Sequence, residues 1–96
     1  MLVNFVSEIQ DVFVEFSVQW DGGESDRTSL ASFNVEVSID MDSMINPPPL
    51  GTSCWARAYL KFGPNHDSSQ NFTFEHGGGV LYTLTGTLDT PSFSMT

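Results

Sequence analysis

Residues 12–20 read Val-Phe-Val-Glu-Phe-Ser-Val-Gln-Trp, and this stretch decides the fold class. Apolar side chains occupy every second position from Val12 to Trp20. The positions between them hold Glu, Ser and Gln, and only Phe13 breaks the alternation. A side-chain period of two is typical of an extended strand with one buried face and one face in water. The stretch therefore predicts a β-strand.

A second run, residues 33–41, alternates in the same way. We predict that the two runs pair antiparallel, because opposed aromatic and β-branched side chains stabilise a sheet. This pairing places Trp20 near Phe33 at one end of the sheet. At the other end it places Val12 near Met41.

The rest of the chain shows the same period and no helical one. We expect further strands over residues 2–10, 54–62, 70–76 and 80–89, and a short last strand over residues 92–96. Within residues 54–62 the alternation predicts an inward face made of Cys54, Ala56, Ala58, Leu60 and Phe62. Residues 63–69 carry turn chemistry, and the proline-rich residues 42–53 predict a connection that crosses from one sheet to the other.

Turn signals about every ten residues, together with period-two strands, favour an all-β fold. We predict a single domain over residues 1–96. Its expected architecture is an antiparallel β-sandwich, Ig-like or jelly-roll-like, or a flattened barrel, with six to eight strands.

The charge balance excludes some classes of partner. The chain carries twelve acidic residues against three basic ones, Arg27, Arg57 and Lys61, for a net charge of −9. Three cations cannot supply a basic face for phosphates, so we expect no nucleic-acid binding. We also expect no membrane insertion, because no run approaches the roughly 20 apolar residues of a membrane helix. No signal peptide is recognisable, which makes the cytoplasm the default expectation.

One group of carboxylates is a candidate metal site. The predicted pairing brings Asp11 beside Asp40 and Asp42 at one end of the sheet. Carboxylates grouped on loops suit Ca²⁺, a hard cation that takes several oxygen ligands. The alternative is that these side chains are ordinary solvated loop carboxylates.

The residue types that carry catalysis do not form a recognisable arrangement. Cys54 is the only cysteine, and its place on the apolar face predicts a buried packing role. His66 and His76 each adjoin an acidic residue, but they are expected at opposite ends of one strand. No nucleophile elbow or phosphate loop is present. We therefore predict a protein that is not an enzyme.

The opposite face of residues 54–62 is the main candidate binding surface. Trp55, Arg57, Tyr59 and Lys61 follow one another along it, and Phe13 is expected to join them. Aromatic and arginine side chains are enriched in the cores of protein interfaces. The alternative is that Trp55 and Tyr59 cover the sheet while the basic side chains extend into water.

Three functions follow from these candidates. The first is a non-catalytic interaction module that binds a protein partner or a second copy of itself. The second is a carbohydrate-binding β-sandwich domain, with Ca²⁺ at Asp11, Asp40 and Asp42. The third and least favoured is a small hydrolase-like enzyme.

Overall fold

The computed structural model describes residues 1–96, and its regular secondary structure is β-strand apart from one short helical turn. That turn is the 3₁₀ segment η1 (Met41–Ser43). The strands are β1 (Leu2–Ser7), β2 (Val14–Trp20), β3 (Gly23–Glu24), β4 (Glu36–Asp40), β5 (Ser53–Leu60), β6 (Asn65–Asp67), β7 (Phe72–Thr73), β8 (Gly79–Gly86) and β9 (Pro91–Met95).

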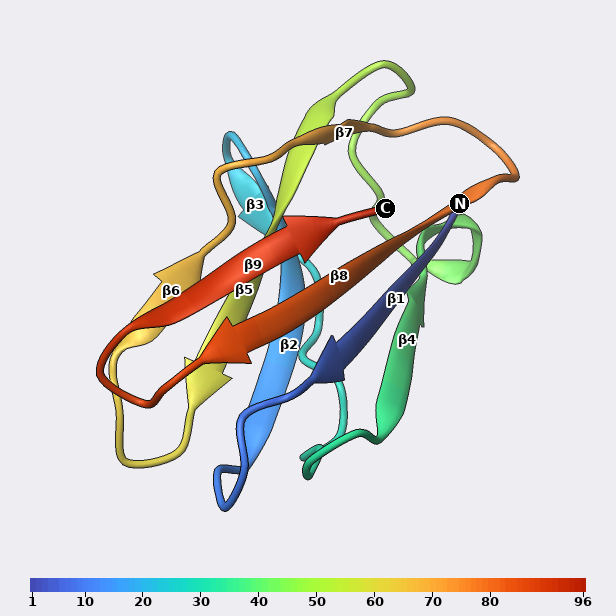
Figure 1. Ribbon diagram of the computed structural model, residues 1–96. Coiled ribbons are helices and arrows are strands. Elements are labelled where there is room, and N and C mark those ends of the chain that lie inside the picture. The colour runs from blue at the N-terminus through green and yellow to red at the C-terminus, as the bar shows by residue number, and fades with distance from the viewer.

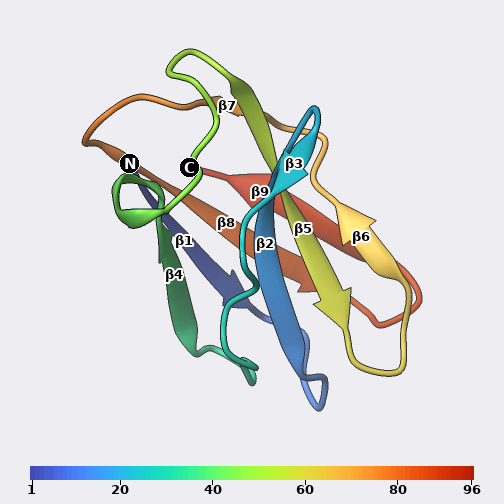
Figure 2. The same ribbon diagram turned by 180° about the vertical axis from the view of Figure 1, so that it is seen from behind.

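The strands form two sheets that pack face to face, which confirms the predicted all-β sandwich (Figure 1). Sheet A has the order β4-β1-β8-β9. Sheet B has the order β3-β2-β5-β6, with β7 also paired to β5. Figure 2 shows the molecule from the side of sheet B. Nine strands are present, more than the expected six to eight, because β3 and β7 are only two residues long.

The predicted partnership of residues 12–20 with 33–41 is wrong. β2 pairs antiparallel with β5 over its whole length, so Trp20 lies opposite Cys54. β4 belongs to the other sheet, where it pairs antiparallel with β1. The alternation correctly predicts a strand in each segment, but a period of two does not indicate which strands pair with each other.

One pairing in sheet A is parallel, unlike all the others. β1 and β8 run side by side in the same direction, with Phe5 opposite Tyr82. This pair joins strands separated by most of the chain and lies in the middle of the sheet.

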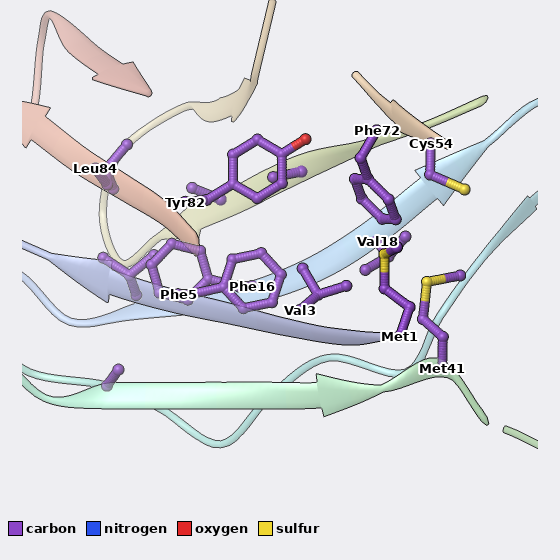
Figure 3. Packing of buried hydrophobic residues seen from close by; sticks show 14 of the residues in the cluster. Met1, Val3, Phe5, Phe16, Val18, Met41, Cys54, Phe72, Tyr82 and Leu84 are labelled. Carbon is purple, nitrogen blue, oxygen red and sulfur yellow. The ribbon is translucent and has the colours of Figure 1, made fainter. Parts of the chain in front are cut away.

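The core lies between the two sheets and combines aromatic rings with aliphatic and sulfur-containing side chains (Figure 3). Phe5 from sheet A stacks on Phe16 from sheet B, with ring centroids 4.9 Å apart. Phe5 also stacks on Tyr82 at 6.1 Å. All three rings are fully buried, so this stack contributes both apolar area and favourable ring geometry.

Serine and threonine residues pair with the backbone of sheet B at positions where β2 or β5 has no strand beside it. The Thr28 N–H donates to the Phe16 carbonyl at 2.8 Å, while its hydroxyl accepts the Phe16 N–H at 3.0 Å. Ser25 makes the same two-way pair with Val18, and Ser68 makes it with Ala56. One residue thus satisfies both backbone groups that an edge would otherwise leave unpaired.

Several strand limits differ from those expected. Phe62 was predicted to point inward, but it is 93% exposed because the backbone turns out of the strand there with a φ of 63°. Residues 65–67 of the expected loop form β6. Only Phe72–Thr73 of residues 70–76 is strand. Phe72 and Phe74 are nevertheless both buried.

The proline-rich residues 42–53 cross from sheet A to sheet B, which confirms the predicted connection. Pro48 is buried. The Gly51 N–H donates to the Phe74 carbonyl at 2.8 Å, so the segment is tied to the body of the molecule.

Candidate functional site

The outer face of sheet B carries the row of residues that the alternation in β5 predicts. Cys54, Ala56, Ala58 and Leu60 are buried against the core. Trp55, Arg57 and Tyr59 therefore point the other way, and each is partly exposed. From Trp55 to Lys61 the row extends about 20 Å, at about 3.3 Å per residue.

Arg57 is held in place by a carboxylate of β6. Its Nε donates to Asp67 Oδ1 at 2.6 Å and its Nη2 donates to Asp67 Oδ2 at 3.0 Å, a two-pronged ion pair. The Trp55 indole N–H donates to the same carboxylate at 3.2 Å. The hydrogen bond from Arg57, followed by that from Trp55, lowers the pKa of Asp67 against the opposing effect of burial. Asp67 thus orients two of the four side chains in the row, Trp55 and Arg57.

Tyr59 is held by a carboxylate of β3, at the opposite edge of the sheet from Asp67. Its hydroxyl donates to Glu24 Oε2, and so do the Ser17 hydroxyl at 2.9 Å and the Gln19 amide at 2.6 Å. Partial burial alone would raise the pKa of Glu24, but the hydrogen bonds from Tyr59, Ser17 and Gln19 outweigh it and lower the pKa. Glu24 therefore stays ionised and fixes the tyrosine.

Arg27 lies over the ring of Tyr59. Its guanidinium carbon is 3.6 Å from the ring centroid, close enough for a cation–π interaction. Arg27 also forms an ion pair with Glu15 at 3.5 Å. One face of the Tyr59 ring is consequently covered by a charged side chain.

Apolar side chains border the row at the Lys61 end. The Phe13 carbonyl accepts the Lys61 N–H at 2.9 Å, and the Phe13 side chain is 50% exposed. Ala31 pairs with Val14 and is buried, so its neighbour Leu30 points outward and is 49% exposed. Phe13 and Lys61 thus lie side by side at the end of the row that carries Trp55, Arg57 and Tyr59.

The charges are distributed unevenly over the molecule. All three cationic side chains, Arg27, Arg57 and Lys61, lie on this outer face. Three of the twelve carboxylates, Glu15, Glu24 and Asp67, lie among them. The face is therefore neutral, and the other nine carboxylates account for the whole net charge of −9.

The carboxylates of the candidate Ca²⁺ site are not brought together. Asp40 caps η1 by accepting the Asp42 N–H, at the end of β4 that lies opposite Leu2. Asp11 follows β1 and lies in a turn beyond the opposite end of that pair. The error follows from the wrong strand pairing, and no group of three His, Cys, Asp or Glu side chains in the structure is placed to hold a metal.

Asp42 is engaged in contacts of another kind. It accepts hydrogen bonds from the Met1 amino group at 2.6 Å and from the Gly77 N–H at 3.2 Å, and it lies 3.0 Å from His76 Nδ1. The Met1 amino group, followed by His76 and Gly77, lowers the pKa of Asp42 well below its usual range. Through these contacts Asp42 joins η1 to the turn before β8.

The remaining residues with catalytic chemistry are separated. Cys54 is fully buried, as predicted, and burial raises the pKa of its thiol to about 11. His66 stacks on Phe93, with ring centroids 5.8 Å apart. His76 lies beside Asp42 instead.

The carboxylates that orient the row were missed by sequence analysis. Asp67 and Glu24 lie in β6 and β3, which have three and two residues. Strands this short show no recognisable alternation. The sequence shows only that Glu24 precedes and Asp67 follows the strand that carries Trp55, Arg57 and Tyr59. It gives no indication of how close they lie to that strand in space.

Comparison of the chain with models of protein families, with curated proteins and with solved structures finds no match. No helix in the structure has the length and apolar character needed to cross a lipid bilayer.

Proposed function

We propose that the protein is a non-catalytic interaction module that associates with a second copy of itself through the outer face of sheet B. The observation that supports this proposal most directly is the neutrality of that face in a molecule of charge −9. Two such molecules repel each other, and the repulsion is smallest where both present a surface without net charge.

The chemistry of the face suits an interface that binds its own copy. A two-fold dimer brings the same patch together from both partners, so the patch must be complementary to itself. Cations and carboxylates alternate across this patch, with Arg57 beside Asp67 and Arg27 beside Glu15. Rotation by a half turn therefore allows opposite charges of the two copies to meet.

The aromatic and arginine side chains are also preorganised. Asp67 fixes Trp55 and Arg57, and Glu24 fixes Tyr59, so little side-chain freedom is left to lose on association. A standard interface needs about 800 Å² from each partner. That is roughly one seventh of the 5221 Å² surface of this chain.

Carbohydrate binding is the weaker proposal for the same face. Sugars stack on open aromatic rings, whereas Arg27 covers one face of Tyr59. The carboxylates that would accept sugar hydroxyls are occupied by Arg57, Trp55 and Tyr59.

Sedimentation equilibrium over a wide range of protein concentration tests the proposal. We expect a reversible dimer that persists in EDTA. Replacement of the exposed apolar border, Phe13→Ser with Leu30→Ser, should shift the protein to monomer. The matched control is Leu50→Ser, at a side chain that is 57% exposed but lies in the proline-rich connection.

A monomer at every concentration would overturn the proposal. So would a dimer that the control variant and the border variant weaken equally, because the contact would then lie elsewhere.

A further inference from the structure

One seam of the sandwich is closed and the other is open. On the closed side, His66 of β6 stacks on Phe93 of β9. There the Met95 N–H of β9 donates to the Gln70 side chain at 3.0 Å. On the open side, a groove of about 570 Å³ separates β4 from residues 24–28 of the opposite sheet edge. Figure 2 shows β4 at the margin of the molecule, beside the chain that follows β3.

The free backbone groups of β4 line this groove. The Met41 N–H donates to the Met1 carbonyl, and Val3 and Phe5 lie opposite Ile39 and Val37. Because hydrogen-bonding direction alternates along a strand, the even residues direct their N–H and C=O groups away from β1. Glu36, Ser38 and Asp40 therefore present unpaired groups along the edge.

β4 differs in this respect from β2, β5 and β9. Ser25 and Thr28 cap N–H groups of β2, Ser68 caps one N–H of β5, and Gln70 caps one N–H of β9. No side chain caps an N–H of β4. An unpaired strand edge is a template on which an extended segment can pair.

The residues that line the groove indicate which side chains such a segment would carry. Ile39 and Met44 line it and pack against the core, so they offer an apolar floor. Three carboxylates, Glu24, Asp26 and Asp40, and one cation, Arg27, line its polar rim, which is therefore acidic on balance. Glu36 is exposed on the same strand as Asp40. A segment that pairs with β4 places alternate side chains on the floor and in the solvent.

We propose that β4 is a β-augmentation site for an extended basic segment of a partner protein, with Lys or Arg alternating with aliphatic residues. The aliphatic side chains pack on Ile39 and Met44, and the basic ones face Asp26, Glu36 and Asp40. This inference does not rest on the proposed self-association, since its backbone pairing uses the free edge of β4 in sheet A and not the outer face of sheet B.

A short fluorescent peptide of alternating lysine and valine is a suitable probe. We expect its anisotropy to rise with the protein, and the amide resonances of Ser38 and Asp40 to shift and exchange more slowly. The double variant Asp26→Lys with Glu36→Lys should weaken binding about tenfold, since two attractions become repulsions. The control Asp89→Lys reverses an exposed charge outside the groove and should leave binding unchanged.

The variant Ser38→Pro tests the backbone pairing itself. Proline is accepted on an edge strand where its nitrogen faces solvent, so folding should survive while peptide binding is lost. The charge variants keep the test valid if Ser38→Pro unfolds.

Absence of peptide binding overturns the proposal, as does equal binding by a lysine–proline peptide that cannot pair. If Ser38→Pro instead abolishes self-association that Phe13→Ser leaves intact, the edge is occupied by a second copy, and the proposal is also overturned.

Discussion

The hydroxyl of Thr28 is expected to contribute measurably to stability because it accepts the N–H of a fully buried strand residue. In Thr28→Val the side chain keeps its shape and the backbone bond from residue 28 to Phe16 is retained. The Phe16 N–H, however, loses its acceptor at 3.0 Å. A buried donor left unsatisfied destabilises a protein by about 1–3 kcal/mol.

The free energy of unfolding, measured in urea, should therefore fall by about 2 kcal/mol without a change in the m-value. For a domain of this size, each kcal/mol corresponds to about 4–8 °C in Tm. The Phe16 amide should also exchange faster with solvent. Thr73→Val is the matched control, because Thr73 is an exposed strand residue whose hydroxyl has no partner within the protein.

A Thr28→Val variant within about 0.5 kcal/mol of the parent, the range typical of surface substitutions, would refute this account of the sheet edge. Equal losses in Thr28→Val and Thr73→Val would refute it as well, since the effect would then belong to valine and not to the lost acceptor.

Three further outcomes are expected. The lowered pKa of Asp67 stabilises the fold above the unfolded pKa of about 4, and this contribution is lost as the pH falls through the folded pKa. In Arg57→Gln the free energy of unfolding should therefore decrease less steeply on acidification than in the parent. An unchanged dependence of the unfolding free energy on pH would contradict this. Gly86→Ala should lose more free energy of unfolding, measured in urea, than Gly51→Ala, and the difference should be about 1–3 kcal/mol. Both have positive φ, but only at Gly86 would a Cβ lie 2.3 Å from a backbone carbonyl oxygen; equal losses would count against the clash. Phe62→Asn should raise Tm slightly, because asparagine tolerates the φ of 63° and a 93% exposed ring gives up little burial; a marked fall would show that the ring has a packing role.

The fold class could be predicted from alternation, whereas the neighbours of each strand could not. Residues 33–41 and 54–60 both alternate well enough to pair with β2. β5 takes one edge of β2, and the hydroxyls of Ser25 and Thr28 occupy the other, so no edge of β2 is left for residues 33–41. Side-chain acceptors that replace backbone ones leave no periodic signal, so this arrangement could be found only in three dimensions.

For the candidate site as well, only the residues that share one strand could be predicted. Trp55, Arg57 and Tyr59 were placed together because one strand carries all three. Their partners Asp67 and Glu24 come from different strands, and contacts between strands depend on pairing that the sequence pattern does not specify. The predicted grouping of Asp11 with Asp40 and Asp42 was wrong for this reason, since it depended on one assumed pairing.

The parallel pairing of β1 with β8 affects how the protein is made on the ribosome. Most of sheet B can assemble once residues up to 73 have emerged, but β1 must wait for a neighbour about 77 positions further along the chain. Contacts this distant in sequence form slowly. During that interval the apolar inner face of β1 lacks one of its two lateral partners, so synthesis rate and chaperone access are expected to influence the yield of folded protein.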